Sequence, residues 1–165
     1  MAALVVAIAA LAVAMVAASI SVRQLGEAKK ANAFPATVDL FREYRSVEMV
    51  KARRLLFHGL ADADPTGGIR GMPDDLARAA LRVSHYLDNL GVLVAHRLID
   101  PRLAAGFLGD STLRLWKDLA PFIYSEREFR NPNAYLQYFE HLACTLREVQ
   151  PMRVREELSV WGPDE

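Results

Sequence analysis

The stretch "HYLDNLGVLVAH", residues 85–96, belongs to a helix that is predicted to begin at Pro73 and reach about Leu98. Apolar residues recur there at helical spacing and cover most sides of the C-terminal half, which is typical of a helix surrounded by others. The sequence therefore predicts a fold built around this central helix. Its expected core stripe is Leu76, Ala80, Val83, Leu87, Leu90 and Val94.

A groove of small side chains is also predicted on this helix, formed by Ser84, Asp88, Gly91 and Ala95. A neighbouring helix that packs there would desolvate the Asp88 carboxylate, which is costly unless the carboxylate is paired. We therefore expect Asp88 to be buried or half-buried at a helix–helix junction. The expected partners lie on the preceding helix and are Arg42, Tyr44 and Arg45.

The two histidines of the stretch, His85 and His96, are too far apart to share a metal ion. Eleven residues of helix separate them by about 16 Å along the axis. Histidine pairs that bind one metal ion stand four residues apart on a helix, and this helix has no such pair. We expect His85, Asn89 and His96, like Asp88, to be structural polar residues, and we expect no metal ion or other cofactor.

The remainder of the chain after residue 36 is predicted to be helical, with no convincing strand pattern. Helices are expected over residues 37–58, from residue 100 to a stop at Gly109, over 111–129 with a kink or break at Pro121, and from residue 131 onward. In the last of these, Leu136, Phe139, Ala143 and Leu146 form a helical stripe. The predicted fold is thus all-α, a compact bundle of about five helices over residues 37–150, followed by a polar tail over 151–165 with at most a short helix.

The N-terminal segment is predicted to be a single transmembrane helix over residues 1–22. Residues 2–20, "AALVVAIAALAVAMVAASI", contain no charge and no proline, and about 20 such residues span a bilayer core. No basic residue precedes the run, whereas Arg23, Lys29 and Lys30 follow it within the predicted linker, residues 23–36. The positive-inside rule then predicts an inner (plasma) membrane protein with its N-terminus outside and its domain in the cytoplasm.

A stripe of small residues runs along one face of this predicted anchor. Such stripes let membrane helices approach closely, although an alanine-rich span also produces them by chance. The residues of this stripe, which we expect to make the transmembrane packing contacts, are Ala3, Ala7, Ala10, Ala14, Ala17 and Ser21.

Charge and cysteine content exclude several classes of function. The formal net charge is zero, which argues against a nucleic-acid-binding surface. The lone Cys144 permits no intramolecular disulfide. Cys144 stands three residues after His141 on the last predicted helix, so the pair is a weak candidate for a nucleophile and its base. The loop "DADPTGGI", residues 62–69, has part of a calcium-loop spacing, but Pro73 occupies the position of the essential glutamate.

The stretch "YLDNLGVLVAHRLIDPRLAAGFLGDSTLRLWKDLAPFI", followed by "YLQYFEHL", resembles an uncharacterised bacterial domain-of-unknown-function family. The resemblance covers roughly residues 35–150. It implies one N-terminal membrane span and a small helical domain, and it implies no activity.

These features together predict a membrane-anchored accessory or scaffold subunit, with no catalytic residues, that presents a helical domain for protein–protein interaction. The expected partners are the lipid bilayer and a membrane or cytoplasmic protein, or a second copy of the chain, with no nucleic acid. Two alternatives remain open: a membrane-tethered hydrolase that uses Cys144 and His141, and a lipid- or ligand-sensing domain with a cavity beside Asp88 and Gly91.

Overall fold

The computed structural model describes residues 11, 14–21, 24, 35, 37–130 and 134–158. The chain divides into two compact units, Met1–Ala36 and Thr37–Glu165, which are treated separately here. Throughout the described residues the regular structure is helical, and no strand occurs in them. The all-α prediction is confirmed for this part of the chain.

In the N-terminal unit, residues 14–21 are helical and their side chains are exposed. The hydroxyls of Ser19 and Ser21 each donate a hydrogen bond, 2.9 Å long, to the carbonyl four residues earlier. Over the residues described, no helix has the length and apolar character required to cross a bilayer. Much of the expected anchor and linker, with Ala3, Ala7 and Ala10 of the stripe, lies outside the described residues.

The larger unit begins with helical residues 37–44. Five α-helices follow, joined in part by two 3₁₀ turns, within the described residues. In chain order these elements are α2 (Val47–Gly59), η1 (Pro65–Gly67), η2 (Ile69–Gly71), α3 (Asp74–Ala95), α4 (Pro101–Phe129), α5 (Gln137–Val149) and α6 (Pro151–Leu158).

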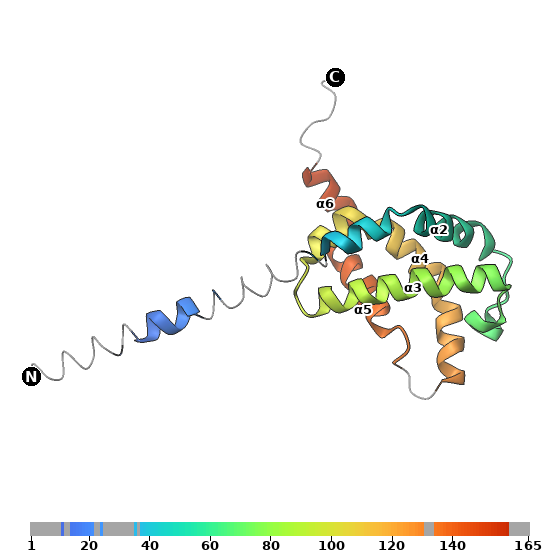
Figure 1. Cartoon of the computed structure of the whole chain (residues 1–165), viewed down its shortest axis with the longest axis horizontal. Coiled ribbons are helices and arrows are strands. Elements are labelled where there is room, and N and C mark those ends of the chain that lie inside the picture. The colour runs from blue at the N-terminus through green and yellow to red at the C-terminus, as the bar shows by residue number, and fades with distance from the viewer. Residues whose placement is uncertain are drawn as a thin grey trace, which may run out of the picture. The chain divides into compact units, whose positions relative to one another are not determined.

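Helix α3 is the central helix of the unit. It packs against α5 and α2, and α4 packs against α5 and α6 (Figure 1). All six residues of its predicted stripe are buried, and so are the four residues of the predicted stripe in and beside α5. The apolar spacing therefore identified the buried faces of both helices correctly.

The first predicted helix, 37–58, is in fact two helices. The chain turns at Arg45 and Ser46, and the Ser46 hydroxyl accepts a hydrogen bond from the Met49 backbone N–H at 3.2 Å. Serine is a favoured N-cap because its side chain satisfies an amide that the helix leaves without a partner. Ser46 thus starts α2. The preceding segment is tied to α3 by the Tyr86 hydroxyl, which donates to the Leu40 carbonyl at 3.0 Å.

The predicted helices over 100–109 and 111–129 are in fact one helix, α4. The predicted stop at Gly109 is wrong because this glycine serves packing: a Cβ there would lie 2.4 Å from Cγ of Pro151, at the start of α6. The helix also continues through Pro121. Buried neighbours, among them Leu119, Phe122 and Ile123, hold the helix against the core despite the hydrogen bond that proline removes.

The segment predicted to be a polar tail includes α6. Pro151 and Val154 of this short helix are buried, and the helix packs against α4 and α5. At least this part of residues 151–165 belongs to the packed unit.

Candidate functional site

Asp88 and Gly91, here called the α5 cradle, position the first turn of α5 on α3. A Cβ on Gly91 would lie 2.1 Å from the Tyr138 carbonyl oxygen, so only glycine admits the backbone of α5 at this distance. One turn away, Oδ1 of Asp88 accepts a hydrogen bond from the Phe139 backbone N–H at 2.9 Å. A carboxylate at a helix N-terminus satisfies an unpaired amide and interacts favourably with the helix dipole.

The predicted groove is therefore the docking surface for α5, and the half-buried Asp88 does stand at a helix–helix junction. The partners expected for it are wrong. Tyr44 forms a 2.6 Å hydrogen bond with the Ser111 hydroxyl, Arg42 pairs with Asp39, and Arg45 lies over the Phe107 ring. The ligand cavity considered beside Asp88 and Gly91 is also wrong, because the backbone of Tyr138 fills that position.

The other polar residues of the central stretch lie at the surface. His85, Asn89 and His96 are exposed, and the His96 ring is 6.3 Å from that of Tyr138. In the described part of the chain, no group of three histidine, cysteine or acidic residues could hold a metal ion. The stretch therefore organises packing through Asp88 and Gly91.

Cys144 and His141 both lie on the exposed face of α5. Among the hydrogen bonds of the described residues, none joins the two side chains. The neighbouring buried residues Leu142 and Ala143 face the core instead. The pair is open to solvent on a helix surface.

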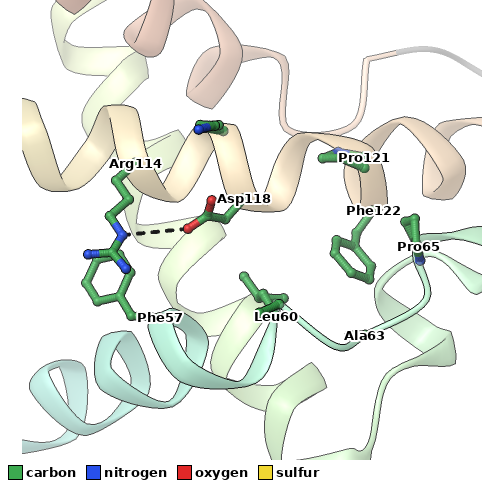
Figure 2. A pocket seen from close by; sticks show the side chains of 10 residues that line it. Phe57, Leu60, Ala63, Pro65, Arg114, Asp118, Pro121 and Phe122 are labelled. Atoms are coloured by element: carbon green, nitrogen blue, oxygen red, sulfur yellow. Dashed lines mark ion pairs between the residues drawn. The ribbon is translucent and has the colours of Figure 1, made fainter.

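A pocket of about 570 Å³ opens between the end of α2, the following loop and α4 (Figure 2). We call it the α2–α4 pocket. Its apolar lining comes from Phe57, Leu60, Ala63, Pro65, Pro121 and Phe122, and its polar lining from Arg114, Lys117 and Asp118. The Arg114 guanidinium lies over the Phe57 ring at 4.4 Å, and its Nε is 3.8 Å from Asp118 Oδ2.

A second, more open depression of about 640 Å³ lies where residues 37–47 meet α4. We call it the apolar hollow, and its lining residues are Val38, Phe41, Arg42, Arg45, Ser46, Val47 and Phe107. The rings of Phe41 and Phe107 contact each other with centroids 4.5 Å apart. Val38 and Val47 are exposed, Val47 to 61%.

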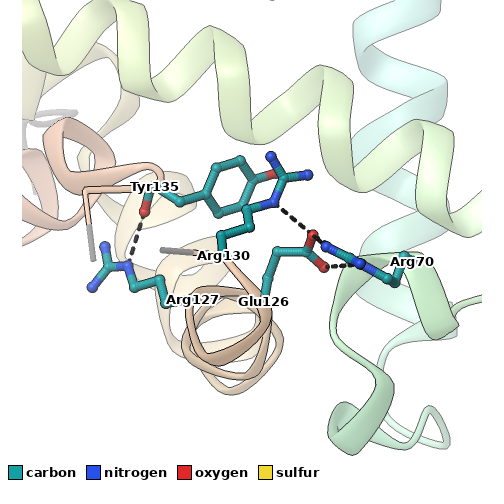
Figure 3. A network of polar contacts seen from close by, with 5 residues as sticks. All are labelled: Arg70, Glu126, Arg127, Arg130 and Tyr135. Carbon is teal, nitrogen blue, oxygen red and sulfur yellow. Dashed lines mark hydrogen bonds and ion pairs between the residues drawn. The ribbon is translucent and has the colours of Figure 1, made fainter. Parts of the chain in front are cut away.

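A buried carboxylate holds the C-terminal half of α4 against the η2 turn (Figure 3). Glu126 is only 1% exposed, and its Oε1 accepts from Nη2 of Arg70 at 2.7 Å and from Nε of Arg130 at 2.8 Å. Burial alone would raise the pKa of Glu126, but the hydrogen bonds and charges of the two arginines outweigh it and lower the pKa. Gly68, with φ +62°, brings the loop so close that a Cβ would lie 2.7 Å from Oε2 of Glu126.

A second ion pair, next to Glu126, joins α4 to α5. Arg127 pairs with Glu140 at 2.7 Å. Its Nε also donates to the Tyr135 carbonyl at 2.9 Å, the contact that Figure 3 shows. The Tyr124 hydroxyl donates to the same Glu140 carboxylate at 2.8 Å. Although burial opposes it, hydrogen bonding from Arg127 and Tyr124 lowers the pKa of Glu140. These contacts fix both ends of the α4–α5 connection.

The comparison with known families gives one match. A family model described as a domain of unknown function, DUF4760, matches residues 2–146. The chain belongs to the DUF4760 family. The match begins within the apolar N-terminal run, so the DUF4760 region includes that run as well as the helical unit. Neither a curated protein nor a solved structure matches the chain.

Sequence reasoning missed the polar groups that hold this DUF4760 domain together. The spacing of Glu126 and Arg130, four residues apart on one helix, was a usable local signal. Arg70, 56 residues before Glu126 in the chain, gave no such local signal. In the structure, Asp64 of the calcium-like loop instead caps η1 by accepting from the Thr66 N–H and hydroxyl, at 3.0 and 2.8 Å.

Proposed function

We propose that the chain is a single-span membrane protein whose small helical domain binds a protein partner, as an accessory or scaffold subunit. The observation that carries this proposal is the apolar hollow. It exposes Val38 and Val47 beside two aromatic rings, and contiguous exposed apolar surface is costly unless a partner covers it.

The chemistry of the apolar hollow favours one kind of partner, an amphipathic helix with acidic residues beside its apolar face. A shallow, aromatic-walled depression accommodates the side chains that such a helix presents at successive turns. Arg42 and Arg45 stand at its border; Arg42 pairs with Asp39, and Arg45 complements an acidic residue of the partner. Arg45 is already held over Phe107, at 4.6 Å, so little side-chain freedom is lost when the partner binds.

The position of the apolar hollow in the sequence links it to the membrane. It begins at residue 38, soon after the proposed anchor over residues 1–22 and the basic residues Arg23, Lys29 and Lys30. We place the N-terminus outside a bacterial plasma membrane and the helical domain in the cytoplasm. The alanine stripe of the anchor then offers a second contact for a membrane helix of the partner or of another copy.

Photocrosslinking in native membranes tests the proposal. The full chain carries benzoylphenylalanine at position 38, and we expect a discrete protein adduct under ultraviolet light. Val47→Glu places a charge in the apolar hollow and should abolish the adduct. Val50→Glu is the matched control, because Val50 is also exposed on α2 but does not line the hollow, and it should leave the adduct intact.

The adduct's composition decides the outcome. Sequencing of the adduct should identify a partner segment that forms an amphipathic acidic helix. If the adduct has twice the mass of the chain, the partner is a second copy of the chain. Lipid adducts alone, or equal loss in both valine variants, would overturn the proposal. The topology is tested in the same cells: exposed Cys144 should react with an impermeant thiol reagent only after the membrane is opened.

A further inference from the structure

The α2–α4 pocket has the size and lining of a small-molecule site. Its volume of about 570 Å³ lies within the range of about 300–1,000 Å³ typical of ligand pockets. Leu60 and Phe122, both buried, and the half-buried Phe57 supply apolar lining. Figure 2 shows Phe122 and Pro65 on one side of the opening and Arg114 above Phe57 on the other. A ligand therefore needs an apolar body.

The polar lining carries one excess positive charge. Arg114 and Lys117 contribute two cations, and Asp118 contributes one carboxylate. The Phe57 ring positions the Arg114 guanidinium, whose ion pair with Asp118 is long at 3.8 Å. Within the described residues the Lys117 side chain makes no ion pair. Both cations are thus available to an anionic group of a ligand.

The same wall of the pocket carries a backbone acceptor. Pro121 has no N–H, so it cannot form the α-helical hydrogen bond to the carbonyl of Lys117 four residues earlier. Lys117 and Pro121 both line the pocket, so the carbonyl that the missing N–H leaves without its α-helical partner belongs to a lining residue. A free carboxylate alone would be repelled there. A ligand that carries a hydrogen-bond donor next to its carboxylate satisfies the cations and the acceptor together.

We propose that the α2–α4 pocket binds an N-acylated apolar amino acid with a free carboxylate. The carboxylate pairs with Arg114 and Lys117, the adjacent amide N–H donates to the Lys117 carbonyl, and the apolar side chain lies against Phe57, Leu60 and Phe122. The C-terminal residue of a peptide has the same chemistry. This inference does not depend on the apolar hollow, which involves other residues.

A ligand series in which one feature is removed at a time tests the proposal. The probe is N-acetyl-4-fluoro-L-phenylalanine, observed by ¹⁹F NMR relaxation with the full chain in liposomes and with protein-free liposomes as the blank. We expect saturable binding that weakens about tenfold for the methyl ester, which lacks the charge, and for the N-methyl analogue, which lacks the donor. N-acetylglycine should not compete. If a tetrapeptide ending in phenylalanine binds more tightly than the probe, the natural ligand is the C-terminus of a protein. If the tetrapeptide and the probe bind equally, the natural ligand is a free metabolite.

Variants locate the site. Arg114→Gln and Lys117→Gln change exposed side chains and should each weaken binding about tenfold, whereas Arg82→Gln, an exposed cation on α3, should not. Pro121→Ala restores the N–H that bonds the Lys117 carbonyl, so it should abolish the preference for the probe over its N-methyl analogue while retaining the preference over the ester. Binding that is absent, that is insensitive to Arg114→Gln and Lys117→Gln, or that shows the same N-methyl preference in Pro121→Ala would overturn the proposal.

Discussion

Two carboxylates, Asp88 and Glu126, each hold a helix of the domain in place, and they do so in different ways. Asp88 is half-buried and accepts a single hydrogen bond from a backbone amide of α5. Glu126 is buried and accepts from two arginines. Each also has a glycine in its junction, Gly91 and Gly68, where a Cβ would contact the opposing atoms closely.

The difference follows from the cost of removing a charge from water. A carboxylate that keeps part of its hydration needs only a modest partner, and the amides of a helix N-terminus suffice. A carboxylate that loses nearly all its hydration stays ionised only when opposite charges replace the water. The arginines at Glu126 remain about half exposed, with side-chain exposures of 56% for Arg70 and 49% for Arg130, so the junction buries only one ion deeply.

The largest expected effect is at the glycine of the Asp88 junction. In Gly91→Ala the added Cβ meets a backbone oxygen, which cannot rotate away, so α5 must shift from α3. We expect a loss of about 3 kcal/mol in the free energy of unfolding. Urea unfolding of the full chain in liposomes measures it through the fluorescence of Trp116, which packs edge-on against Phe139 of α5 at 5.0 Å.

The control for this prediction is Gly71→Ala, because a Cβ at Gly71 meets nothing within 4 Å. Its effect should stay within about 0.5 kcal/mol. Gly68→Ala should lie between the two. Its φ of +62° is strained for alanine, but the closest atom, at 2.7 Å, is the end of the Glu126 side chain, whereas the nearest backbone atom of Glu126 is at 3.2 Å. Equal losses for Gly91→Ala and Gly71→Ala would contradict the docking of α5 on Gly91.

The next largest effect is expected at the buried carboxylate. Glu126→Gln keeps the size of the side chain and removes its charge, which weakens both arginine hydrogen bonds. We expect a loss of about 2 kcal/mol, less than for a wholly buried pair because Arg70 and Arg130 can be rehydrated. The measurement is the same urea titration at pH 7, with Glu128→Gln, an exposed neighbour on α4, as the control.

Acid should reduce the difference in the free energy of unfolding between the native chain and Glu126→Gln. Since the pKa of Glu126 is lowered in the folded state, its contribution is fully present above its unfolded pKa, about 4.3, and is lost as the pH falls through the folded value. Unfolding free energies of both chains measured from pH 7 down to pH 3 should therefore converge. A constant difference over that range would show that the charge of Glu126 does not stabilise the fold.

A smaller effect is expected at the half-buried carboxylate. Asp88→Ala removes the cap of α5 and should cost about 1 kcal/mol. Asp118→Ala removes a carboxylate whose ion pair with the exposed Arg114 is long, so it should cost close to nothing. If Asp88→Ala cost as much as Glu126→Gln, the contrast between a hydrated and a desolvated carboxylate would fail.

Small effects are also expected at the two histidines of the central stretch. His85→Ala and His96→Ala alter exposed side chains, and each should change the free energy of unfolding by no more than about 0.5 kcal/mol. The temperature of half-unfolding, compared with that of Asp88→Ala in the same buffer, measures this ranking. A histidine variant less stable than Asp88→Ala would reverse it.

The buried faces of α3 and α5 could be predicted from the sequence because apolar spacing is a local property of each helix. The extent of α4 could not. Gly109 and Pro121 are ordinary signals for the end of a helix, but Gly109 packs against Pro151, which is distant in sequence, and buried neighbours of Pro121 keep its segment helical. Tertiary packing overrides local preference at both positions.

The polar contacts were likewise only partly predictable from the sequence. The small groove around Asp88 and Gly91 correctly indicated a close helix contact, but it could not identify which helix makes it. The choice of α5 depends on a backbone amide 51 residues away, and backbone amides carry no sequence signal. The i,i+4 pair of Glu126 and Arg130 was visible in the sequence, whereas the approach of Arg70, 56 residues away, follows from the fold.

The cradle formed by Asp88 and Gly91 also has a consequence for the order of folding. Helix α5 has 13 residues, its N-cap position is Leu136 in a left-handed conformation, and that residue provides no side-chain cap. Helices of this length are marginal in isolation because nucleation is costly. The cap that completes the first turn of α5 belongs to α3, so α5 gains full stability only after α3 has formed. Formation of α5 is thereby coupled to its docking, and the amide of Phe139 should exchange with solvent only when α5 separates from α3.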